Sequence, residues 1–124
     1  MSKRLATLAL LLALAAPAGC GGGGDGFADE ANKVCRDSEK EIRAASGSRT
    51  ELVAAVDGLI RDLKAVDVPE DKRSEYDAWV ATQERYFGEL KAALAARDEK
   101  RIDALDDTTG DDKARELGLD SCTG

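Results

Sequence analysis

The sequence predicts an all-α protein, an up-down antiparallel bundle of about four helices. From residue 27 onward apolar residues recur at steps of three and four, the period of an amphipathic helix. No run of this part alternates as a half-buried strand does or is rich in β-branched residues. The periodic segments are joined by short connections, which favours neighbouring helices that run in opposite directions. A chain of 124 residues has room for one such domain, at residues 27–124.

The first two segments carry regular helical stripes. Gly47 lies between them and suits a left-handed C-terminal cap. Ser48 is expected to cap the second helix, with Glu51 three residues on as in a capping box. The second stripe ends before Pro69, a residue that favours the first turn of a helix. The two stripes consist of Phe27, Ala31, Val34, Cys35, Ser38, Ile42 and Ala45, and of Leu52, Val53, Val56, Leu59, Ile60, Leu63 and Val66.

The third segment is the longest, and the fourth is the weakest. Asp98 is expected to cap the fourth helix. Thr108, Thr109 and Gly110 interrupt its apolar pattern, so the sequence leaves open whether it is one helix or two. The third stripe consists of Tyr76, Trp79, Val80, Gln83, Tyr86, Phe87, Leu90 and Leu94, and the fourth of Ile102, Leu105, Ala114 and Leu117.

Residues 1–19 have the features of a bacterial export signal. Lys3 and Arg4 precede an apolar run at residues 5–16. A run of about twelve residues is too short to cross a hydrocarbon core, which needs about 20. A basic start, a short apolar run and small residues after it are typical of a cleaved secretory signal.

The end of this signal, Pro17, Ala18, Gly19 and Cys20, resembles the lipobox of bacterial lipoproteins. In that family the cysteine receives a diacylglyceryl group and becomes the first residue of the mature protein. The resemblance implies that Cys20 anchors the domain to the cell membrane on its extracytoplasmic face. Pro17 stands where the family usually has leucine. Cleavage after Ala18, which would release a soluble secreted protein with a free cysteine, is the alternative.

Residues 20–26 contain the lipidated cysteine and a glycine-rich linker. A flexible coil of about six such residues spans roughly 13 Å on average, which would keep an anchored domain near the bilayer. Two acyl chains on one cysteine are sufficient for stable anchoring. The expected membrane contact is therefore the lipid on Cys20.

Charge and composition exclude several classes of function. The chain has 18 Lys and Arg against 25 Asp and Glu; loss of Lys3 and Arg4 with the signal leaves 16 against 25, a net charge of −9. Such a domain repels phosphate backbones, so we expect no nucleic-acid partner. The chain contains no histidine, the commonest general base and transition-metal ligand. We expect no catalytic residues, no metal and no cofactor.

Acidic residues surround the Thr-Thr-Gly turn of the fourth segment without the spacing of a calcium-binding EF-hand loop. They are expected to serve as helix caps and as a solvated face. These residues are Asp103, Asp106, Asp107, Asp111 and Asp112.

Cys35 and Cys122 remain once Cys20 is acylated. Disulfides persist in exported proteins, so we expect a bridge between them. By loop-closure entropy, closing about 87 residues stabilises a fold by about 4.5 kcal/mol. An even number of full-length antiparallel helices would bring Cys122 back towards Cys35 near the start of the first helix. The alternative is two separate thiols.

Trp79, Gln83 and Tyr86 are the candidate contact residues for a ligand or partner. Aromatic residues at helical spacing are more often core, and a glutamine more often lies at the stripe edge with its amide in solvent. One hypothesis is a non-enzymatic, lipid-anchored domain that binds or modulates an envelope protein. The other is a module that holds a small apolar molecule between helices. A pocket lined by Trp79, Gln83 and Tyr86 would favour the second, and a filled core with an exposed apolar stripe the first.

Most of the chain resembles small actinobacterial lipoproteins of uncharacterised function. The resemblance rests on Cys20 with its four glycines, on Phe27, Ala28, Ala31, Asn32 and Cys35, and on Leu117, Gly118, Leu119 and Cys122. It implies no known activity.

Overall fold

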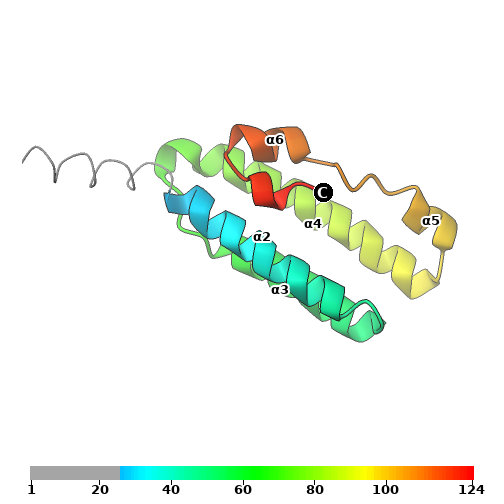
Figure 1. The fold of residues 1–124 in the computed structure, drawn as a ribbon. Helices are drawn as coiled ribbons and strands as arrows, with labels where there is room; N and C mark the ends of the chain where they lie inside the picture. Colours follow the sequence, from blue (N-terminus) through cyan, green and yellow to red (C-terminus); the bar gives the residue numbers. More distant parts are fainter. Residues whose placement is uncertain (1–25) are drawn as a thin grey trace, which may run out of the picture.

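The computed structural model describes residues 26–124, and this part of the chain is all-α, as predicted (Figure 1). It contains no strand, and none of its helices is long and apolar enough to cross a bilayer. The expected signal at residues 1–19, Cys20 and the linker up to Asp25 lie outside the described residues. The elements are α2 (Gly26–Ala44), α3 (Arg49–Lys64), α4 (Glu70–Ala96), α5 (Glu99–Asp103), α6 (Asp111–Glu116) and the 3-10 helix η2 (Asp120–Cys122).

Two of the predicted caps are present. The Ser48 hydroxyl accepts a hydrogen bond of 3.3 Å from the backbone N–H of Glu51, at the start of α3. The Asp98 carboxylate accepts one of 3.1 Å from the N–H of Arg101, at the start of α5. Both bonds satisfy donors that a helix N-terminus leaves without an intrahelical partner.

The prediction of a left-handed Gly47 is wrong. Within residues 26–124, positive φ angles occur only at Arg97, Gly110 and Gly118. Hydrogen-bonded turns over residues 45–48 reverse the chain instead, with the Ser48 N–H donating to the Ala45 carbonyl at 2.9 Å. The α2–α3 connection therefore needs no glycine.

The three long helices form the up-down part of the bundle (Figure 1). Two ion pairs of 2.6 Å, Lys64–Glu84 and Lys91–Asp57, show that α3 and α4 run antiparallel. The backbone of α2 lies mainly against α3 and η2, whereas that of α4 lies mainly against α3 and α5. Helix α3 is therefore the element that α2 and α4 share.

The fourth segment is not a continuous helix, which answers the question that the sequence left open. After α5 the chain runs back along α4 to α6 and η2, and we call residues 97–124 the C-terminal arm (Figure 1). The Asp106 carboxylate stabilises the turn between the two helices, because it accepts bonds from the Thr108 N–H at 3.0 Å and hydroxyl at 2.6 Å. Gly110 then precedes α6 with a φ of 86°.

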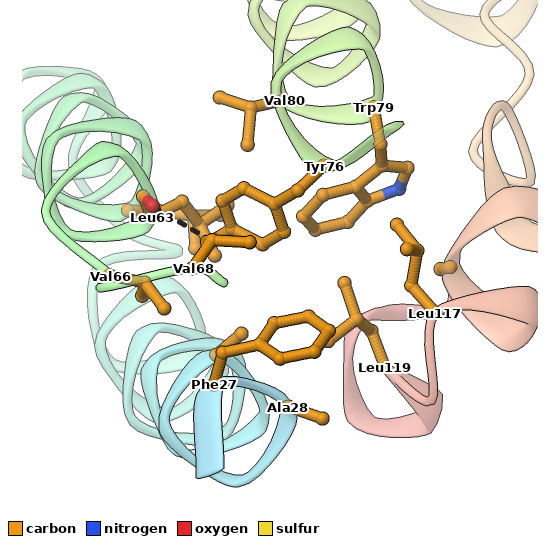
Figure 2. Packing of buried hydrophobic residues seen from close by; sticks show 13 residues of the cluster. Phe27, Ala28, Leu63, Val66, Val68, Tyr76, Trp79, Val80, Leu117 and Leu119 are labelled. Atoms are coloured by element: carbon orange, nitrogen blue, oxygen red, sulfur yellow. Dashed lines mark hydrogen bonds between the residues drawn. The ribbon is translucent and has the colours of Figure 1, made fainter. Parts of the chain in front are cut away.

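The largest buried side chains gather where α2 begins, and we call this the closed end. Figure 2 shows Phe27, Tyr76, Trp79, Leu117 and Leu119 pointing towards one another from α2, α4 and the C-terminal arm. The rings of Phe27 and Tyr76 meet edge to face at 6.1 Å. The Tyr76 hydroxyl donates to the backbone carbonyl of Leu63 at 2.7 Å, so its polar atom is satisfied. The buried cluster consists of Phe27, Ala28, Ala31, Leu59, Leu63, Val66, Val68, Tyr76, Trp79, Val80, Ala114, Leu117 and Leu119.

The opposite end contains the α2–α3 turn, the C-terminal part of α4 and α5, and we call it the open end. Its fully buried residues are small: Ala45, Ala55, Val56 and Ala93. The larger apolar residues of the predicted stripes are half-buried there, because the C-terminal arm contributes just the five helical residues of α5. These half-buried residues are Ile42, Leu52, Leu90, Leu94, Ile102 and Leu105.

Candidate functional site

A groove lies between α2 and α4, and Trp79, Gln83 and Tyr86 all line it. Its volume is about 440 Å³, within the range that small-molecule sites occupy. Because α2 and α4 both pack against α3, the α3 residues form its base. The lining consists of Cys35, Glu39, Ile42 and Arg43 of α2, Leu59 and Leu63 of α3, Trp79, Gln83, Tyr86 and Phe87 of α4, and Asp107, Ser121, Cys122, Thr123 and Gly124 of the C-terminal arm.

The predicted disulfide is present and forms part of the groove wall. The Cα atoms of Cys35 and Cys122 are 5.2 Å apart. The expectation that Cys35 lies near the start of the first helix is wrong, because it lies in the middle of α2. The C-terminal arm returns to the start of α2, where Gly118 lies near Ala28, and then turns back along α2 to Cys122. The bridge therefore forms without a full-length fourth helix.

Hydrogen bonds also hold the C-terminal residues in place. The Asn32 amide donates to the Gly118 carbonyl and its side-chain oxygen accepts from the Ser121 N–H, both at 2.9 Å. The Asp111 carboxylate accepts from the Gly124 N–H at 3.1 Å. Asp111 is 7% exposed, so its expected place on a solvated face is wrong. Sequence reasoning gave Asn32 no structural role, because its partners are 86 and 89 residues away.

Trp79 belongs to both the core and the groove. It is 2% exposed, in agreement with the expectation that the aromatic stripe is core, and its ring lies 5.8 Å from that of Tyr76. Tyr86 and Phe87 form a separate edge-to-face pair at 5.1 Å and are half-buried. The groove thus has an aromatic wall that runs from the core outward along α4.

Gln83 does not leave its amide in solvent, contrary to expectation. Its Nε2 donates to the Thr109 carbonyl at 3.0 Å and so ties the turn before α6 to α4. A Cβ atom at position 110 would lie 2.6 Å from this Nε2 and 3.4 Å from the Trp79 ring. Gly110 is therefore required by close approach as well as by its positive φ.

The two rims of the groove differ in charge. On α2, Glu39 forms an ion pair with Arg43. On the opposite rim, no salt bridge within residues 26–124 involves Asp106 or Asp107. Burial raises the pKa of the Tyr86 hydroxyl, and the negative charges of Asp107 and Asp106 raise it further. The rim formed by Tyr86 and Asp107 is therefore the negative side of the groove.

This arrangement is suited to binding. The Ser121 hydroxyl accepts from Arg36 at 3.2 Å, and the Thr123 hydroxyl donates to the Asp120 carbonyl at 2.9 Å, so both already serve the fold. No group of three or more potential metal ligands occurs in the described part of the chain. Comparison with protein-family models, curated proteins and solved structures finds no match to this chain.

Proposed function

We propose that the mature protein is a lipid-anchored, non-enzymatic module that binds a small apolar molecule at the extracytoplasmic face of the cell membrane. The observation that carries the proposal is the groove of about 440 Å³ lined by Trp79, Gln83 and Tyr86. Its walls are mainly apolar and aromatic, with a few polar groups at the rim, as is typical of ligand sites. The absence of histidine from the chain supports binding rather than catalysis.

The groove is held in shape before any ligand arrives. The disulfide joins the C-terminal arm to α2, and the Gln83 bond to Thr109 joins it to α4. Packing in the core fixes the Trp79 ring. Binding to such a site loses little conformational freedom, which favours affinity.

The anchoring part of the proposal rests on Cys20 and the lipobox resemblance. Helix α2 begins at Gly26, directly after the glycine-rich sequence, so the linker leads straight into the folded domain. Replacement of Cys20 by Ser should move the protein from the membrane fraction to the soluble fraction, or leave the precursor uncleaved. An intact mass with residue 19 at the N-terminus and no lipid would refute the anchor.

Ligand binding can be tested with diphenylhexatriene, a neutral, rod-shaped apolar fluorophore. Trp79 is the single tryptophan of the chain and lines the groove, so energy transfer from it to the probe reports occupancy. We would titrate residues 20–124 carrying Cys20→Ser, which lack both the lipid and the apolar signal and so avoid detergent. We expect saturable transfer with one probe per chain.

Ile42→Phe should weaken this binding, because Ile42 lines the groove and a phenyl ring takes up part of its volume. Lys40→Phe is the matched control, since Lys40 is exposed on the same helix and does not line the groove. Transfer that never saturates, or that both variants weaken equally, would reject the groove as the site.

The second candidate function is the binding of an envelope protein, and the half-buried apolar residues of the open end favour it. Leu90 and Leu94 of α4 are among them. A pull-down from crosslinked native envelope, followed by mass spectrometry, would identify such a partner. If this surface binds it, Leu90→Lys should abolish capture and leave diphenylhexatriene binding unchanged.

A further inference from the structure

The groove has an uneven distribution of charge that a ligand would have to match. The charges of the α2 rim compensate each other in the Glu39–Arg43 pair. At the other rim, Asp106 is occupied by the turn, since it accepts the two bonds from Thr108. Asp107 lines the groove, and its carboxylate has no hydrogen-bond or salt-bridge partner within residues 26–124. The Asp107 carboxylate is therefore an uncompensated negative charge at the groove.

The aromatic wall lies beside this charge. Tyr86 and Phe87 are half-buried, and both line the same groove as Asp107. Aromatic faces attract organic cations through the ring quadrupole. A carboxylate next to an aromatic wall is a chemically suitable site for an amine or a quaternary ammonium group.

We propose that the groove selects amphipathic organic cations. The apolar body of the ligand lies along Trp79, Phe87 and Leu59, and its cationic group lies between Asp107 and the Tyr86 ring. This proposal rests on the proposed function, because it names the ligand class of the same groove. The net charge of −9 expected for the mature domain adds a long-range attraction for cations and a repulsion for anions.

Three probes that share the diphenylhexatriene body test the ligand class: the neutral parent, its trimethylammonium derivative and its propionate derivative. Each probe would be added to oxidised residues 20–124 carrying Cys20→Ser, and energy transfer from Trp79 would measure its binding. We expect the cation to bind about fivefold more tightly than the neutral probe, and the anion more weakly. The advantage of the cation should shrink as salt is added.

Asp107→Asn should remove most of the advantage of the cation and leave the affinity of the neutral probe unchanged, since the amide keeps the shape of the side chain. Asp37→Asn is the matched control. It removes one negative charge from an exposed position on α2 outside the groove, and the advantage should persist.

Equal affinities for the cation and the neutral probe, or an advantage that Asp107→Asn leaves intact, would overturn the ligand class while the proposed function stands. If none of the three probes binds saturably, both proposals fail.

Discussion

The closed end and the open end of the domain are built from the same three long helices, but different parts of the C-terminal arm cover them. At the closed end, the connection between α6 and η2 inserts Leu117 and Leu119 between α2 and α4, and the large side chains become inaccessible (Figure 2). At the open end, α5 adds few apolar residues, and Leu90 and Leu94 stay half-buried. The groove lies between these regions.

The difference teaches that the closed end supplies most of the large buried side chains, and that the candidate groove borders this core and shares Leu59, Leu63 and Trp79 with it. The largest buried apolar side chains, whose burial favours folding, lie at the closed end. The groove exists because the C-terminal arm fills the space between α2 and α4 over only part of their length.

The largest effect is expected from a truncation in the closed end. Leu63 is 1% exposed, so Leu63→Ala should lower the free energy of unfolding by about 2–5 kcal/mol through lost burial and a residual cavity. Leu90→Ala makes the same chemical change at the half-buried open end and should cost less than about 1.5 kcal/mol. Urea denaturation measures both. Equal losses would contradict the proposed contrast between the two ends.

Removal of the disulfide should have the next largest effect. The paired substitutions Cys35→Ser and Cys122→Ser should lower the free energy of unfolding by about 2–4 kcal/mol. Hydrogen exchange should speed up first at residues 111–124, because the bridge holds this part of the arm on α2. Reduction of the wild-type protein should reproduce the change. A melting temperature that does not respond to reductant would disprove the role given to the bridge.

A smaller loss is expected at the turn before α6. Gly110→Ala forces a methyl group against Gln83 in a left-handed backbone conformation, which should cost about 2 kcal/mol. Gly47→Ala is the control, because nothing lies within 4 Å of its added Cβ and its φ is not positive. It should change the stability by no more than about 0.5 kcal/mol. Thermal unfolding of the two variants measures both losses, and equal losses would contradict the role given to Gly110.

The smallest effect is expected at the Tyr76 hydroxyl. Tyr76→Phe removes its bond to the Leu63 carbonyl and should cost about 1 kcal/mol at neutral pH. Burial raises the pKa of Tyr76 in the folded state, so the unfolded chain loses this proton at a lower pH than the folded chain does. The contribution of the Tyr76 hydroxyl to the free energy of unfolding is therefore fully present below a pH of about 10 and falls as the pH rises above that value.

The stability difference between wild type and Tyr76→Phe should consequently shrink as the pH rises above about 10. Urea denaturation at a series of pH values measures it. A difference that stays constant with pH would show that Tyr76 ionises equally easily in both states.

Residues predicted from local pattern agree well with the structure. In the first stripe Phe27, Ala31, Ser38 and Ala45 are buried, and Val34, Cys35 and Ile42 are half-buried. Ser48 and Asp98 cap the helices assigned to them. These features depend on neighbours within one or two helical turns, so the sequence reports them directly.

The sequence by itself therefore determined the all-α class and the extent of the three long helices. It favoured the pairing of Cys35 with Cys122, which the structure contains. It also singled out Trp79, Gln83 and Tyr86, which share one helix face. Only the tertiary structure decided that these three residues line a groove, that Gln83 binds Thr109, and that Asn32 holds Ser121. The physical reason is the C-terminal arm: its apolar pattern is too weak to specify a path, and its contacts join residues 26 to 91 positions apart.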